Sequence, residues 1–252
     1  MNNRQNSKPL WLTTYDFSPG KVTRVLLSAI AMLVLFNIIE RGIVYWLNAQ
    51  NNGQLISIYF NFDEEANLPA LYSSLALAFC AYLLSVIATI KKKGAGKYAK
   101  QWKILAFIFL YLAVDEMCSI HELLIPILRG SMNTKGLLYF PWVIPAFFLV
   151  IIFLIMFRKF ILALPNKTKI QFILAGMVYV FGALGMELIG GYIADNYGYN
   201  MVYGIASTIE ELLEMFGVVI FINALLNYLQ SQALEVHFGL SFEQPNKKKL
   251  NS

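Results

Sequence analysis

Six long apolar segments dominate the pattern of hydrophobic and polar positions along the 252-residue chain. A helix needs about 20 consecutive apolar residues to cross the hydrocarbon core of a bilayer. Because lipid offers no hydrogen-bond partner to an open backbone, each segment is predicted to be helical. The predicted spans are Val22–Leu47, Pro69–Ile90, Trp102–Ile127, Leu137–Phe157, Ile170–Ile193 and Val202–Leu229.

This pattern predicts an all-α fold, an integral membrane bundle of six transmembrane helices at residues 22–229. The basic residues predict its orientation. Of the 20 Lys and Arg residues, four lie in the N-terminal segment, six in the second loop, four in the fourth and three in the tail. Cytoplasmic loops carry such an excess. Segments 1–21 and 230–252 are therefore expected to be cytoplasmic, and the expected location is the bacterial cytoplasmic (inner) membrane.

Composition agrees with a membrane protein, since 58% of the residues are hydrophobic and only 14% are charged. Soluble domains carry about 25% charged residues. The net charge of +5 does not indicate nucleic-acid binding, because the basic residues alternate with apolar segments rather than form one face. The expected partner is the lipid bilayer, and a homo-oligomer stays open. Cys80 and Cys118 lie in apolar segments and are expected to be reduced and buried.

Eight acidic residues interrupt the predicted spans, and within the spans only Arg41 and His121 could oppose them. An ionisable side chain at the centre of a bilayer costs at least about 2.5–3.5 kcal/mol on insertion scales. The acids must therefore be protonated, paired, hydrated or bound to a cation. They are Glu40, Asp115, Glu116, Glu122, Glu187, Glu210, Glu211 and Glu214.

The predicted topology brings acids from at least four helices into the outer half of the bilayer. Asp115, Ser119 and Glu122 have the i, i+4, i+7 spacing of one helical stripe. Glu210 and Glu214 repel each other at i, i+4, so a cation or a shared proton is expected there. Small residues on Glu187's side of its helix predict a close helix approach.

These acids predict a carboxylate and histidine site. The predicted catalytic residues are Asp115, His121 and Glu211. Carboxylate oxygens suit Mg, Ca or Mn, so a divalent metal of open identity is the expected cofactor. Its predicted ligands are Glu116, Glu122, Glu187, Glu210 and Glu214.

Structural interpretations remain open beside this functional one. The acids can form a polar network that only holds the helices together. Glu40 and Arg41 can form a plain ion pair near the membrane interface. Asp63, Glu64 and Glu65 can cap the second helix and favour its positive N-terminus.

Three strings carry a resemblance to a known family: Phe62–Ser73, Val114–Glu122 and Ile209–Met215. With these strings, the chain resembles a family of uncharacterised bacterial polytopic inner-membrane proteins with no established activity. The resemblance implies the membrane topology and the importance of the three strings. On that basis Glu65 and Asn67 join Arg41 as candidate substrate-binding residues.

Three functions follow from this sequence. The first is a cation-dependent membrane enzyme that acts on a lipid or an envelope precursor. The second is a proton- or cation-coupled transporter, because chains of Asp, Glu and His in spanning helices form proton relays. The third is a structural or sensory membrane subunit.

Overall fold

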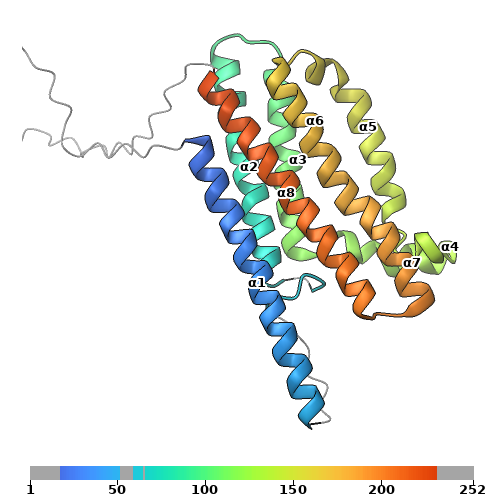
Figure 1. Cartoon of the computed structure of the whole chain (residues 1–252). Coiled ribbons are helices and arrows are strands. Elements are labelled where there is room, and N and C mark those ends of the chain that lie inside the picture. Colours follow the sequence, from blue (N-terminus) through green and yellow to red (C-terminus); the bar gives the residue numbers. More distant parts are fainter. Residues whose placement is uncertain (1–17, 52–58, 65, 232–252) are drawn as a thin grey trace, which may run out of the picture.

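The computed structural model describes residues 18–51, 59–64 and 66–231, which form helices joined by loops and contain no strand (Figure 1). The all-α prediction is confirmed. The elements in chain order are α1 (Pro19–Asn51), α2 (Leu68–Lys93), α3 (Ala99–Cys118), η1 (His121–Leu123), α4 (Leu124–Met132), η2 (Gly136–Leu138), α5 (Val143–Leu162), α6 (Asn166–Val180), η3 (Phe181–Met186), α7 (Glu187–Tyr197) and α8 (Met201–Ser231).

Five of the described helices are long and apolar enough to cross a membrane, and a sixth candidate is the bent pair of α3 with η1 and α4. α6, η3 and α7 continue into one another and form a single candidate span of 32 residues, Asn166–Tyr197. The prediction of several long apolar helices that could span a membrane is therefore confirmed.

The prediction of one continuous helix over Trp102–Ile127 is wrong. α3 ends at Cys118, Ser119 adopts a left-handed conformation with φ of 50°, and the following helical segment leaves at 68° to α3 (Figure 1). Pro126 gives a physical reason, because inside a continuous helix it lacks the N–H donor and its ring collides with the preceding turn. In the structure Pro126 lies in the first turn of α4, where no donor is needed.

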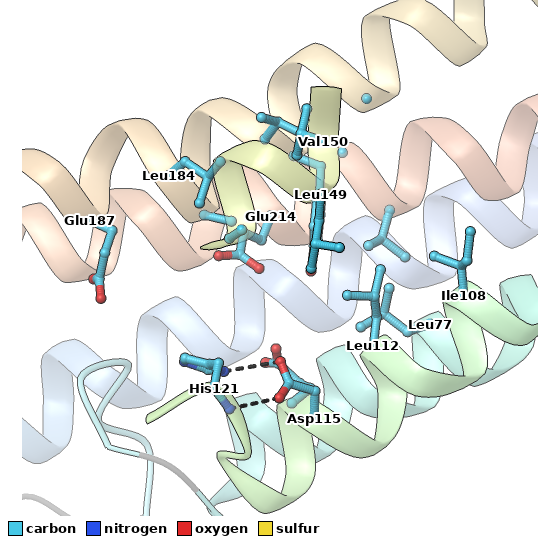
Figure 2. A pocket seen from close by; sticks show the side chains of 18 of the residues that line it. Leu77, Ile108, Leu112, Asp115, His121, Leu149, Val150, Leu184, Glu187 and Glu214 are labelled. Carbon is cyan, nitrogen blue, oxygen red and sulfur yellow. Dashed lines mark hydrogen bonds and ion pairs between the residues drawn. The ribbon is translucent and has the colours of Figure 1, made fainter. Parts of the chain in front are cut away.

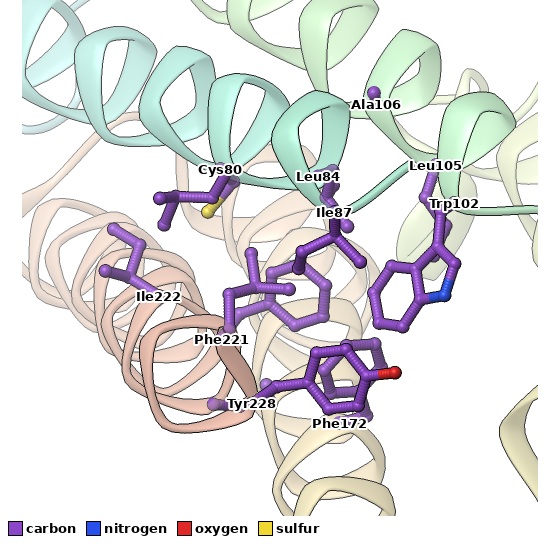
Figure 3. Close-up of a cluster of buried hydrophobic side chains, with 14 of the residues drawn as sticks. Cys80, Leu84, Ile87, Trp102, Leu105, Ala106, Phe172, Phe221, Ile222 and Tyr228 are labelled. Atoms are coloured by element: carbon purple, nitrogen blue, oxygen red, sulfur yellow. The ribbon is translucent and has the colours of Figure 1, made fainter. Parts of the chain in front are cut away.

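A cluster of aromatic and aliphatic side chains holds one end of the bundle together (Figure 3). The ring of Trp102 at the start of α3 lies 5.0 Å from that of Phe160, 5.9 Å from that of Phe172 and 5.1 Å from that of Tyr228. Edge-to-face and offset contacts of this kind are favourable for aromatic pairs. Cys80 is buried here as expected, whereas Cys118 is exposed, because it ends α3 at the bend.

Glycines let α8 approach η3 and α6 closely. A Cβ atom added to Gly182 would lie 2.9 Å from the main-chain oxygen of Glu210, and one added to Gly217 would lie 2.8 Å from the main-chain nitrogen of Tyr179. Any larger residue would therefore force the helices apart. Gly190 is also buried, in agreement with the predicted close approach beside Glu187.

Candidate functional site

A large cavity with a volume of about 1840 Å³ lies between α2, α3, α5, α8 and the continuous helix α6–η3–α7 (Figure 2). Nine acidic residues of the described part of the chain line it. These residues are Asp63, Glu64, Asp115, Glu116, Glu122, Glu187, Glu210, Glu211 and Glu214. Acids of α3, α7 and α8 thus converge as predicted, whereas Glu40 of α1, which was predicted to join them, is not among the lining residues.

The acids occupy one end of this cavity. On α3 the lining begins with Ile104 and ends with Asp115 and Glu116, and on α8 it runs the opposite way, from Tyr203 through the glutamates to Phe221. We call the part formed by His121 and the nine acids the acidic end, and the part formed by the apolar lining side chains the apolar end. Figure 2 shows the carboxylates of Glu187 and Glu214 facing the Asp115–His121 pair across the acidic end, and apolar side chains such as Ile108 further along.

Asp115 and His121 form the best-defined pair of the acidic end. Oδ2 of Asp115 lies 3.0 Å from Nδ1 of His121, and Oδ1 accepts a hydrogen bond of 2.9 Å from the main-chain N–H of the same histidine. The bend at Ser119 creates this geometry, because it turns the chain so that His121 faces back toward the last turn of α3. The predicted stripe of Asp115, Ser119 and Glu122 is therefore wrong, since the helix ends before it is complete.

Two contacts to one carboxylate fix both the position and the tautomer of the imidazole. When Asp115 is ionised, Nδ1 of His121 carries the proton, and proton exchange with a bound molecule takes place at Nε2. In the wall of the cavity, the side chain of Asp115 is 15% exposed and that of His121 is 24% exposed. This arrangement is suited to general acid–base chemistry.

A tryptophan connects this histidine to a second pair of acids. The indole ring of Trp142 lies 4.5 Å from the imidazole of His121, and its Nε1 donates a hydrogen bond of 2.6 Å to Oε1 of Glu187. The carboxyl groups of Glu187 and Glu210 are hydrogen-bonded to each other. A hydrogen bond between two carboxyl groups needs a proton on one of them. Glu187 of α7 and Glu210 of α8 are therefore positioned to share one proton.

Glu187 follows a π-helical turn, η3, which covers Phe181–Met186. A π-turn is wider than an α-turn, and such turns are frequent at functional sites. It sits where Gly182 packs against the main chain of Glu210. The turn and the glycine together set how the carboxyl group of Glu187 meets that of Glu210.

Asp63 reaches the cavity from the loop before α2. Its carboxylate accepts hydrogen bonds from the side chains of Tyr203 and Ser207 on α8. Burial raises the pKa of Asp63, and these two hydrogen bonds and Arg41 oppose the shift. Burial and the neighbouring charges of Asp63 and Glu122 also raise the pKa of Glu64.

The expectation that Asp63 or Glu64 caps α2 is wrong. The N-cap of α2 is Asn67, whose side-chain oxygen accepts a hydrogen bond of 3.1 Å from the main-chain N–H of Ala70. Asn67 also donates a hydrogen bond of 2.5 Å to the main-chain oxygen of Asn61. Both loop acids line the cavity, while the capping of the helix is done by an amide.

Two of the predicted substrate-binding residues, Arg41 and Asn67, lie behind the cavity wall. Neither belongs to the described lining, and the side chain of Arg41 donates a hydrogen bond to Oδ1 of Asn61. Glu40 accepts hydrogen bonds from the main-chain N–H groups of Tyr59 and Phe60, at 3.1 and 2.7 Å. These side chains hold the loop that carries Asp63.

The third of those candidates, Glu65, lies outside the described residues. The predicted metal ligands line the cavity, but no three His, Cys, Asp or Glu side chains of the described part of the chain are spaced to hold a metal ion. The divalent metal stays a prediction. Glu214 is instead hydrogen-bonded to the phenol of Tyr179.

The sequence interpretation missed Trp142, Tyr179, Tyr203 and Ser207. Trp142 lies in a group of aromatic residues that resembles a membrane-interface belt, so the sequence does not distinguish it from an interfacial anchor. A signal existed for two others, because Tyr203 and Ser207 precede Glu210 by seven and three residues and so share its face of α8.

A family described as a domain of unknown function, DUF8692, matches residues 25–229, and the chain belongs to this family. The match includes the Asp115–His121 pair and all of the acids that line the cavity. No curated protein and no solved structure matches the chain. Membership of an uncharacterised family is thus confirmed.

Proposed function

We propose that this protein is a membrane-embedded enzyme that performs acid–base chemistry on a lipid or a lipid-linked envelope precursor in the bacterial cytoplasmic membrane. The Asp115–His121 pair in the wall of a large, mainly apolar cavity carries this proposal. The distribution of Lys and Arg supports cytoplasmic termini, which puts the acidic end of the cavity in the outer half of the bilayer.

His121 is the proposed general base and acid. Imidazole exchanges protons near neutral pH, and a carboxylate on Nδ1 orients the ring and stabilises its charged form. Glu187 and Glu210 hold a further proton nearby, connected to the imidazole through the ring of Trp142. Glu211 lines the same end and is the second carboxylate of the proposed catalytic set. Hydrolysis or group transfer at a lipid headgroup is the reaction class that uses such an arrangement.

The exposed rim of the cavity supports entry of the substrate from the bilayer. Among the lining residues, Phe107 of α3 is 60% exposed, and Phe147 and Leu149 of α5 are 55% and 65% exposed. Large exposed apolar patches mark contact with lipid or with a partner. In a bilayer these side chains contact acyl chains, so a lipid can enter sideways without leaving hydrocarbon.

The test is comparative lipid analysis of a host that expresses the wild-type chain or the His121→Gln variant. We expect one lipid class to be depleted and a product to accumulate with the wild type only. His237→Gln is the matched control, because it makes the same change outside the family match. Identical lipid profiles for wild type and His121→Gln, at equal protein levels, would overturn the proposal.

A divalent metal among the acids is a separate part of the proposal. Carboxylate oxygens on α3 and α8 face one cavity, and hard oxygen ligands suit Mg, Ca or Mn. Metal analysis of the purified protein tests this part. We expect the wild type to contain stoichiometric metal and Glu211→Gln to contain none. Metal-free protein with full activity would refute the metal part of the proposal and leave the proposed role of His121 unchanged.

Proton-coupled transport is the second candidate function, and the proton shared by Glu187 and Glu210 favours it. Acid pairs that bind and release a proton are components of transport relays. Vesicles with an imposed pH gradient distinguish the two functions. Proton flux that is lost in Glu187→Gln, without any change in lipid composition, would support transport over catalysis.

A further inference from the structure

We infer that the molecule bound in this cavity is a cationic amphiphile, with an amine-bearing headgroup at the acidic end and a hydrocarbon chain at the apolar end. The inference deepens the proposed function and rests on the same cavity. It adds the charge and the shape of the ligand, which an acid–base pair does not determine by itself.

The charge of the cavity wall selects the headgroup. Nine of the chain's 15 acids are part of the described lining, whereas none of its 20 Lys and Arg residues is. Arg41 behind the wall, a proton shared by Glu187 and Glu210, and a protonated His121 would together still not balance nine carboxylates. A phosphate or carboxylate headgroup would face like charges in a medium of low dielectric constant, while an ammonium group would be attracted.

Aromatic rings beside the acids add to this preference. Trp142, Tyr179 and Tyr203 line the same end of the cavity. Each is also hydrogen-bonded to an acid, namely Glu187, Glu214 and Asp63, respectively. Aromatic faces attract ammonium groups through cation–π contacts, and carboxylates accept their N–H donors.

The apolar end provides a place for a long chain. The lining of α3 extends from Asp115 back to Ile104, which at the helical rise per residue corresponds to roughly 16 Å. Phe160 of α5, Phe172 of α6 and Phe221 of α8 line the far part. A hydrocarbon chain buries its surface there, and the hydrophobic contact adds to the attraction of the headgroup.

Binding of three probes with the same chain and different headgroups tests the inference. The probes are hexadecylamine, hexadecanol and hexadecanoate, added at equal mole fractions to the purified full chain in phosphatidylcholine nanodiscs. Native mass spectrometry measures the bound fraction, and thermal unfolding reports stabilisation. We expect hexadecylamine to bind at least about tenfold more tightly than hexadecanol, and hexadecanoate least, as expected for one or more charge-assisted contacts.

Two variants localise the binding. Glu210→Gln/Glu211→Gln should abolish the preference for the amine, while the matched control Glu235→Gln/Glu243→Gln, outside the family match, should keep it. Gly176→Phe adds a ring to the cavity wall at a position where no neighbouring atom lies within 4 Å of the new Cβ atom, so it should weaken binding of the amine without disturbing the fold.

Equal binding of the amine and the alcohol by the wild type would overturn the inference, as would an unchanged preference in Glu210→Gln/Glu211→Gln. The His121→Gln variant separates this result from the proposed function, because it removes the base but keeps all nine acids. Amine-selective binding without any change in host lipids would refute the enzyme and leave the ligand class standing. Changed host lipids without amine-selective binding would refute the cationic ligand and leave the proposed enzyme standing.

Discussion

The indole of Trp142, just before α5, donates a 2.6 Å hydrogen bond to the carboxyl group of Glu187, the first residue of α7. The two residues are 45 positions apart in the chain. The same indole packs against His121, so one side chain contacts both the Asp115–His121 pair and Glu187, which neighbours Glu210. The position of α5 and the chemistry of the acidic end are therefore linked.

Removal of this hydrogen bond should destabilise the protein. Trp142→Phe keeps a ring against His121 but deletes the N–H donor to Glu187, and a buried acceptor left without its donor costs about 1–3 kcal/mol. Chemical denaturation of wild type and variant measures the difference. A double-mutant cycle with Glu187→Met, which removes the acceptor, should show coupling, and strictly additive effects would contradict the predicted link.

Asp115→Asn should reduce activity much more than stability. The amide oxygen of asparagine can still accept the hydrogen bond from the main-chain N–H of His121, but the negative charge that orients and supports the imidazole is lost. We expect at least about a hundredfold loss of lipid conversion, as for removal of a general acid–base group. Activity within threefold of the wild type, in a folded variant, would show that the pair does not act in catalysis.

Gly182→Ala should be strongly destabilising. The new Cβ atom would lie 2.9 Å from the main-chain oxygen of Glu210, and overpacking of this kind costs about 1–3 kcal/mol. Gly176→Ala is the matched control, since the same methyl group meets open space in α6 and removes a flexible residue from a helix. The thermal midpoint should fall for the first variant only, and equal midpoints would show that η3 and α8 do not pack so closely.

The pH dependence of stability should change in Asp63→Asn. Burial raises the pKa of Asp63 in the folded state above its ordinary value of 3.8. The folded state therefore binds a proton more tightly than the unfolded state, and the contribution of this group to stability decreases as pH rises from 3.8 through the raised pKa. Relative to Asp63→Asn, the wild type should lose stability over this window.

Thermal midpoints of both proteins from about pH 4 to about pH 8 measure this difference. Asp63 is only partly buried, so the change is expected to be modest. A wild type that instead gains stability over Asp63→Asn as pH rises would show that the hydrogen bonds from Tyr203 and Ser207 outweigh burial.

The sequence by itself determined the helical class of the chain, the segments long enough to span a membrane, and most of the acids of the cavity. These features are local, since apolar length and acidic residues inside apolar segments can be counted along the chain. The acids at 115, 187 and 210 were found in this way, because charge at such positions has a high cost wherever the helices pack.

Only the tertiary structure decided which of these groups meet and in what geometry. The bend at Ser119 turns His121 back onto Asp115, and the glycine at 182 lets Glu187 reach Glu210 on another helix. Arg41 and Asn67 proved to hold a loop, while Asp63 entered the cavity. The physical reason is that a one-dimensional pattern fixes the cost of a buried charge, whereas its partner is fixed by packing between segments far apart in the chain.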